Sequence, residues 1–84
     1  MTDEQEQKVV LLADGFNLGF LGMTQEWNGR VRSVYDFDRC VRVLMRRDKM
    51  TEEEAVEFME FNVVGSYVGE ATPLFVRRMK VTEI

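Results

Sequence analysis

Histidine is absent from this chain of 84 residues, and cysteine occurs only once, as Cys40. Without histidine, the chain lacks the usual general base at neutral pH and the commonest metal ligand. With one cysteine and no histidine, zinc sites, cysteine–histidine nucleophiles and intrachain disulfides are excluded. Because Cys40 falls on the inner face of a predicted helix, we expect it to remain a reduced thiol.

Long apolar runs are also missing. The run at 9–13, VVLLA, is too short for a membrane span or a secretory core, and the eight residues before it are polar and rich in acidic side chains. We therefore expect a cytoplasmic protein with no membrane partner. The net charge of −4 disfavours general nucleic-acid binding, because phosphate binding requires a basic surface.

Few routes to catalysis remain. The segment ADGFNLGFLG at 13–22 has spaced glycines, but it lacks both a Walker lysine and the dinucleotide-binding spacing. A carboxylate-based hydrolase using Asp14, Asp36 or Asp38 is the one chemistry left. A chain this short has little material for both a cleft and a core. We predict no enzymatic activity, no cofactor and no metal site.

The strongest local signals lie in residues 36–69, which predict two helices joined by a tight turn. Asp36 or Asp38 can cap the first helix, and its apolar residues fall on one face. A connection of only three residues, 48–50, makes the two helices antiparallel neighbours.

The second helix begins with a capping box, TEEE at 51–54. In this motif the Thr51 hydroxyl accepts from the Glu54 N–H, and the Glu54 carboxylate accepts from the Thr51 N–H. Apolar periodicity predicts that the helix spans 52–67, with Gly69 as its C-cap.

Three other segments, at 18–23, 31–35 and 74–79, have strand character. The loop at 25–30 contains Asn28-Gly29, a strong hairpin signal. We predict one α+β domain over 1–84, with 1–8 frayed. Its element order is ββααβ, and a small antiparallel sheet of two or three strands packs on the antiparallel two-helix hairpin.

Four stretches of the chain together resemble a known group of proteins: DGFNLGFLG, VYDFDRCVRVLM, MTEEEAVEFMEFNVVGSYVGE and ATPLFV. The group comprises small uncharacterised proteins of bacteriophages and bacterial genomes, and the resemblance covers residues 11–76. It implies a phage or bacterial cytosolic setting, in which small proteins often bind a host protein. It implies no particular activity.

Arginines are concentrated in the first helix. Arg39, Arg42 and Arg46 share one face at helical spacing. One interpretation is a solvated face neutralised by glutamates of the next helix. The other is a docking patch for an acidic partner or a phosphate backbone. Arg77 and Arg78 either extend this patch or protect an edge strand from pairing with another chain.

The second helix carries an acidic face formed by Glu53, Glu57 and Glu60. These side chains are either ordinary solubilising glutamates or a mimic of nucleic-acid phosphates that occupies a basic site on another protein. Two further residues interrupt the apolar pattern of this helix. For Asn62 we expect a structural hydrogen bond, and for Gly65 the close approach of another backbone.

Trp27 lies in the hairpin loop, where a tryptophan either folds back on the sheet or stands exposed as an interface anchor. Phe20 raises the same question, since nine aromatic residues are many for so small a core.

We predict a non-enzymatic protein-interaction module that binds a host or phage protein, or itself. A nucleic-acid-associated protein using the first-helix arginines is the alternative, and a small carboxylate-based enzyme is a distant third. The candidate partner-binding residues are Trp27, Phe20, Arg39, Arg42, Arg46, Glu53, Glu57 and Glu60.

Overall fold

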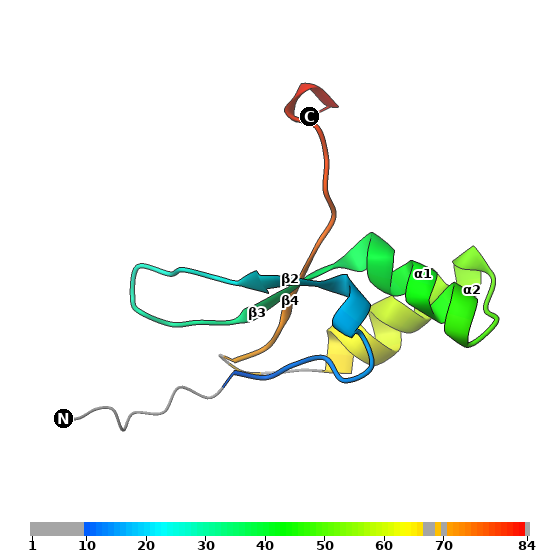
Figure 1. The fold of residues 1–84 in the computed structure, drawn as a ribbon, viewed down its shortest axis with the longest axis horizontal. Coiled ribbons are helices and arrows are strands. Elements are labelled where there is room, and N and C mark those ends of the chain that lie inside the picture. Colours follow the sequence, from blue (N-terminus) through cyan, green and yellow to red (C-terminus); the bar gives the residue numbers. More distant parts are fainter. Residues whose placement is uncertain (1–9, 67–68, 70, 84) are drawn as a thin grey trace.

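A computed structural model describes residues 10–66, 69 and 71–83 of the chain. The predicted frayed segment 1–8 lies outside the described residues. The α+β class and the order ββααβ are confirmed (Figure 1). The main elements are β2 (Phe20–Met23), β3 (Ser33–Asp36), α1 (Phe37–Arg47), α2 (Glu52–Phe58) and β4 (Leu74–Val76), with a short 3-10 helix η1 (Asn17–Gly19) before β2 and another, η4 (Val81–Glu83), near the C-terminus.

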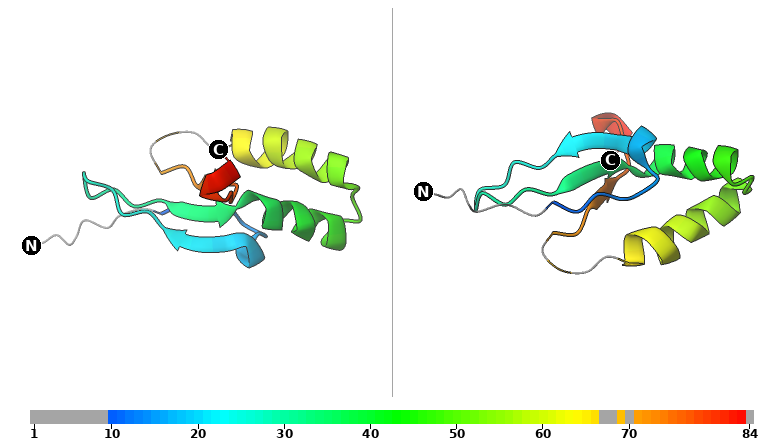
Figure 2. Two further views of the ribbon diagram at one scale, coloured as in Figure 1. Left: turned by 90° about the horizontal axis from the view of Figure 1, so that it is seen from above. Right: turned by 60° about the horizontal axis from the view of Figure 1, so that its bottom comes forward.

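The three strands form one sheet in the order β2-β3-β4. β2 pairs with β3 antiparallel, as a hairpin requires, but β4 pairs with β3 parallel, with Tyr35 opposite Phe75. The expectation of an all-antiparallel sheet is therefore wrong. The helical hairpin is the physical reason: α1 leads away from the sheet and α2 leads back. The chain therefore returns to the end where β3 begins and runs in the same direction (Figure 2).

The helical hairpin extends beyond the end of the sheet at which β3 continues into α1 (Figures 1 and 2). The helical hairpin therefore packs against one end of the sheet and does not cover a whole face of it. Much of the sheet surface is consequently not covered by the helices, and several apolar side chains of β2 are exposed.

The predicted N-terminal caps of both helices are confirmed. Asp36, rather than Asp38, caps α1, and its carboxylate accepts from the Arg39 N–H at 3.1 Å. At α2 the Thr51 N–H donates to Glu54 Oε1 at 2.9 Å, and the Glu54 N–H donates to Thr51 Oγ1 at 3.1 Å. Each bond satisfies a backbone or side-chain group that the first helical turn leaves unpaired.

The second helix is not one uninterrupted α-helix. After α2 it continues as a π-helix, η2 (Met59–Val63), and then as a 3-10 helix, η3 (Val64–Ser66). Residue 67, the last of the predicted helix, lies outside the described residues. The π-helical turn keeps Met59 and Val63 buried.

This irregular turn also leaves Asn62 exposed, and its amide makes no hydrogen bond to any described residue. The interpretation of Asn62 as a structural hydrogen bond is therefore wrong. The close approach expected at Gly65 exists, but to a different partner. A Cβ there would lie 3.1 Å from the carbonyl oxygen of Glu60, which belongs to the preceding turn and not to another element.

Tyr35 occupies the centre of the sheet and is fully buried. Its hydroxyl accepts from the backbone N–H of Ala13 at 2.8 Å. Its ring meets Phe20 edge-on and stacks on Phe75, each with centroids 5.5 Å apart. One side chain of β3 thus joins β2, β4 and the segment before η1. Nearby, Ser33 Oγ donates to the Leu11 carbonyl at 2.7 Å and holds the same segment.

The rest of the core lies between the two helices and η1. Its buried residues are Ala13, Phe16, Tyr35, Phe37, Cys40, Val41, Leu44, Ala55, Met59 and Val63. Gly19 lets η1 rest directly on α1, because a Cβ there would lie only 2.7 Å from the Cys40 sulfur.

We predict that Tyr35→Phe lowers the free energy of unfolding by about 1–3 kcal/mol, because the buried Ala13 N–H loses its acceptor. Urea denaturation with an unchanged m-value measures this loss. Ser33→Ala is the matched control and should cost less, since the exposed Leu11 can turn its carbonyl to water. A Tyr35→Phe variant as stable as the wild type would contradict the role given to this bond.

Candidate functional site

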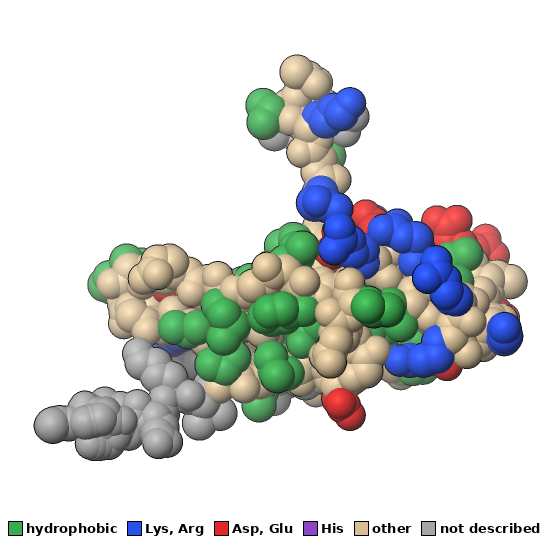
Figure 3. Space-filling view, viewed as in Figure 1, with side chains coloured by type: hydrophobic (Ala, Val, Ile, Leu, Met, Phe, Trp, Pro, Cys, Tyr) green, Lys and Arg blue, Asp and Glu red, His purple; other side chains and the backbone are tan. Residues whose placement is uncertain are grey.

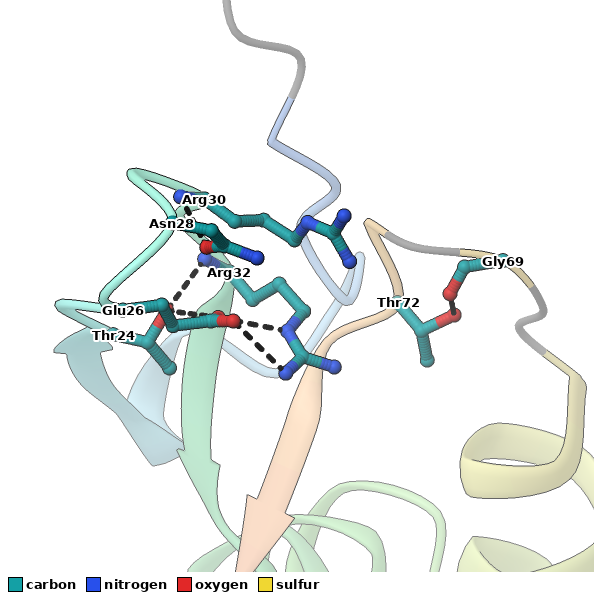
Figure 4. A network of polar contacts seen from close by, with 7 residues as sticks. All are labelled: Thr24, Glu26, Asn28, Arg30, Arg32, Gly69 and Thr72. Atoms are coloured by element: carbon teal, nitrogen blue, oxygen red, sulfur yellow. Dashed lines mark hydrogen bonds and ion pairs between the residues drawn. The ribbon is translucent and has the colours of Figure 1, made fainter.

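The connection between β2 and β3 is braced by side-chain hydrogen bonds (Figure 4). Thr24 Oγ1 accepts from the Arg32 N–H at 2.9 Å and donates to Glu26 Oε2 at 2.8 Å. Arg32 Nε donates to the same carboxylate oxygen at 3.0 Å. These bonds from Arg32 and Thr24 lower the pKa of Glu26. At the tip, Asn28 Oδ1 accepts from the Arg30 N–H at 2.9 Å. The turn therefore has a defined shape.

This braced turn presents Trp27 to solvent. Its side chain is 97% exposed, so the interpretation in which it folds back on the sheet is wrong. Trp27 is the only tryptophan of the chain and the most exposed of its described large hydrophobic residues. A rigid turn that holds a large aromatic side chain fully in water contributes nothing to the core. The anchor interpretation of Trp27 is the one consistent with this geometry.

Other apolar side chains are exposed on β2 and the segments before it. They are Leu11, Leu12, Leu18, Phe20, Leu21 and Met23. Figure 3 shows hydrophobic side chains gathered over this part of the molecule. No charged residue occurs from 15 to 25. Phe20 has a double role, because it touches Tyr35 on one side and is 40% exposed on the other.

An open groove of about 510 Å³ lies between α1 and the loop that carries η1. It is lined by Gly15, Leu18, Arg39, Arg42, Val43, Arg46 and Arg47, which we call the arginine groove. The predicted arginine face is thus a concave surface with apolar side chains in it. In Figure 3 the Lys and Arg side chains form a row over the helical part of the molecule.

The four groove arginines differ in how they are held. Arg47 is fixed: its Nη1 donates to the Gly15 carbonyl at 2.8 Å, its guanidinium lies over the Phe16 ring, and it pairs with Asp48. Arg39 approaches the Asp36 carboxylate at 3.8 Å. By contrast, Arg42 and Arg46 are exposed, and no described carboxylate lies within ion-pair distance of either.

The glutamates of α2 do not neutralise these arginines. Among the described residues no ion pair joins α1 to α2, so the interpretation of a mutually neutralised face is wrong. Glu53, Glu57 and Glu60 are all exposed. They line a second shallow groove, of about 570 Å³, together with Glu52, Val56 and Phe61. We call this the acidic face.

The C-terminal arginines do not extend the arginine groove. Arg78 Nε lies 3.1 Å from the Asp36 carboxylate, and Arg77 pairs with Asp38 at 3.9 Å while lying over the Phe37 ring. These contacts also explain why β4 ends at Val76 and not at residue 79 as predicted: the next two side chains turn toward the start of α1.

Asp36, one of the three candidate acids, and the Cys40 thiol both have shifted pKa values. Burial of Asp36 opposes its ionisation, but the Arg39 N–H and the charges of Arg78 and Arg39 outweigh it and lower its pKa. This carboxylate caps α1 and already interacts with both Arg39 and Arg78. Burial, with a smaller effect of Asp36, raises the pKa of Cys40 to about 11, so the thiol is neutral at physiological pH.

Within residues 10–66, 69 and 71–83, no three Cys, Asp or Glu side chains converge as a metal ion would require. No helix in the same part of the chain is long and apolar enough to cross a membrane.

Comparison with known proteins adds no assignment: no family model matches the chain, and no curated protein or solved structure matches it either.

The structure gathers six of the predicted site residues at two separate surfaces. The structure joins Arg39, Arg42 and Arg46 in the arginine groove, and it groups Glu53, Glu57 and Glu60 on the acidic face. Trp27 stands apart at the hairpin tip. The sequence analysis missed Leu18 and Val43, the apolar side chains of the groove. Val43 follows Arg42 directly in the chain, but only the packing of η1 on α1 brings Leu18 to the same place.

We predict that acidification destabilises the protein partly through Asp36. Its folded-state pKa is lowered, so its contribution is present above the unfolded pKa of about 4 and is lost as the pH falls through the folded value. Unfolding free energies measured from pH 7 to pH 2 should therefore fall less steeply in Asp36→Asn, which keeps a cap but has no charge to titrate. The exposed Asp14→Asn is the control, and an equal flattening there would contradict the assignment to Asp36.

Proposed function

We propose that this chain is a small protein-interaction module that performs no chemistry and docks a protein partner through Trp27. The observation that carries this proposal is a tryptophan 97% exposed on a turn braced by Thr24, Glu26 and Arg32. Tryptophan is among the residues that dominate binding energy at interfaces. Burying it against a partner removes roughly 200 Å² of apolar surface from water, a gross gain of about 5 kcal/mol.

The bracing supports the proposal as much as the exposure does. Association costs free energy for every side chain and loop that becomes ordered at the interface. The hydrogen bonds between Thr24, Glu26 and Arg32 already fix the turn, so a partner meets Trp27 in a preset position. The uncharged apolar surface of β2 beside the turn offers further contact area without the need to bury a charge.

The partner's setting rests on the resemblance to small phage and bacterial proteins. A cytosolic protein of the bacterial host, or another phage protein, is the partner class that this setting favours. No cofactor, metal or membrane enters the proposal.

A second candidate function is nucleic-acid association through the arginine groove. The observation in its favour is that Arg42 and Arg46 are exposed and lack a described carboxylate partner. Against it, Arg77 and Arg78 are paired with Asp38 and Asp36, and the net charge is −4. A salt-dependent mobility shift that is weakened in Arg42→Gln/Arg46→Gln supports this candidate, and no shift at low salt rules it out.

We predict that Trp27→Ala weakens partner binding by at least about 30-fold, or about 2 kcal/mol, while the free energy of unfolding changes by no more than about 0.5 kcal/mol. The experiment compares wild-type, Trp27→Ala and Phe61→Ala proteins as baits in nuclease-treated bacterial lysate. Phe61 is a matched control, because it is an aromatic side chain 71% exposed on the other side of the fold.

The expected result is one protein captured stoichiometrically by wild type and Phe61→Ala but not by Trp27→Ala. With the purified partner, the fluorescence of the single tryptophan should shift to shorter wavelength as Trp27 leaves water. Equal capture by all three baits would contradict the proposal. Species captured from untreated lysate but absent after nuclease treatment would support nucleic-acid association instead.

A further inference from the structure

We propose that the arginine groove takes a second copy of this chain, whose acidic face docks in it. The two surfaces lie on different helices of the same helical hairpin. The arginine groove faces η1, on the outer side of α1, while the acidic face is the outer side of α2. A molecule with one basic and one acidic helix surface can associate with its own copies even though its net charge is −4.

The spacing of the charges matches when the two helices run in opposite directions. Arg39, Arg42 and Arg46 are separated by three and then four residues. Glu60, Glu57 and Glu53, taken backward along the chain, are also separated by three and then four. Each set covers seven residue steps, about 10.5 Å for the arginines of α1. Glu53 and Glu57 lie in α2, and Glu60 lies in the π-helical turn η2 that continues it. An antiparallel contact between α1 of one copy and α2 of another therefore places three arginines opposite three glutamates in one register.

The same register also aligns apolar side chains. Val43 comes directly after Arg42, and Val56 comes directly before Glu57, so in the antiparallel contact the two valines lie at the same height on opposite flanks of the row of charges. Each surface carries one further exposed apolar side chain at its edge, namely Leu18 beside the arginines and Phe61 beside the glutamates. Burying these gives the flanks of the contact apolar area that charges alone would lack.

Ion pairs within the monomer do not compete strongly with the proposed contact. Arg42, Arg46 and the three glutamates are exposed and lack a described ion-pair partner, and only Arg39 has a weak one in Asp36 at 3.8 Å. Exposed pairs of this kind are individually weak. The association should therefore appear at protein concentrations of about 0.1–1 mM and not at nanomolar levels.

The contact is heterologous, because different surfaces of the two copies meet. α1 and α2 are antiparallel within one copy, so the α1 helices of two copies joined this way run in the same direction. The pair retains one free acidic surface, on the copy whose groove is filled, and one free basic surface, on the other copy. Such a contact propagates into open chains unless its rotation closes a ring. It does not involve Trp27, so it is independent of the partner docking proposed above.

Two variants that each lose one surface isolate this contact. Arg42→Gln/Arg46→Gln removes two groove charges, and Glu53→Gln/Glu57→Gln removes two charges of the acidic face. Each variant alone should remain monomeric at concentrations where the wild type self-associates in sedimentation velocity. An equimolar mixture should form a heterodimer and nothing larger, because only one complementary pair of surfaces remains.

Nuclear magnetic resonance then locates the contact. When the ¹⁵N-labelled Glu53→Gln/Glu57→Gln variant is titrated with the unlabelled arginine variant, amide shifts are expected at groove residues such as Gly15 and Val43. Exchanging the label should move the shifts to the outer side of α2. Raising the salt from about 50 to 500 mM should weaken the association by about tenfold or more.

The control Lys49→Gln/Lys80→Gln changes the net charge as much as the arginine variant does, but both lysines lie outside the groove. It should self-associate like the wild type, and so should Trp27→Ala. The proposal is overturned if the wild type stays monomeric at 1 mM in low salt, if either surface variant alone still associates, or if the mixture shifts only amides of β2 and the hairpin tip.

Discussion

The hydrogen bond from the Ala13 N–H to the Tyr35 hydroxyl is the contact on which most of this small fold depends. Tyr35 lies in the central strand, between Phe20 of β2 and Phe75 of β4. One residue further along, Asp36 ends the strand and caps α1. Two consecutive side chains thus define the sheet, the segment that precedes it and the start of the helical hairpin. Cys40 is a free thiol, so no disulfide within the chain shares this task.

This concentration of buried contacts at one junction shapes the surface. The hairpin extends from the end of the sheet, so β2 and the turn after it remain largely uncovered. The aromatic side chains divide accordingly: Phe16, Tyr35 and Phe37 are buried, whereas Trp27 and Phe61 are exposed. The charges divide as well, with arginines on the outer side of α1 and glutamates on the outer side of α2. The proposed docking rests on this division, because it leaves one aromatic side chain and two charged helix surfaces exposed.

Local features of the fold could be predicted from the sequence, and long-range features could not. The capping box at Thr51 and the cap at Asp36 depend on residues three positions apart, so their chemistry is visible in the sequence. The parallel direction of β4 depends on how far α2 carries the chain back, which no local pattern encodes. The exposure of Trp27 depends on cross-strand bonds between Thr24, Glu26 and Arg32, none of which the turn signal at Asn28-Gly29 requires. The arginines of α1 were visible, but the groove also needs Leu18, which arrives through packing of η1 around Gly19.

Native-state hydrogen exchange at the Ala13 amide tests the central role of Tyr35 most directly. Ala13 precedes any regular element, so nothing in its local backbone explains protection from solvent. The account predicts that this amide opens only with the core, with protection within about tenfold of the slowest amides of α1. Exchange as fast as that of the exposed Leu12 would show that the segment before η1 opens independently, and would contradict the account.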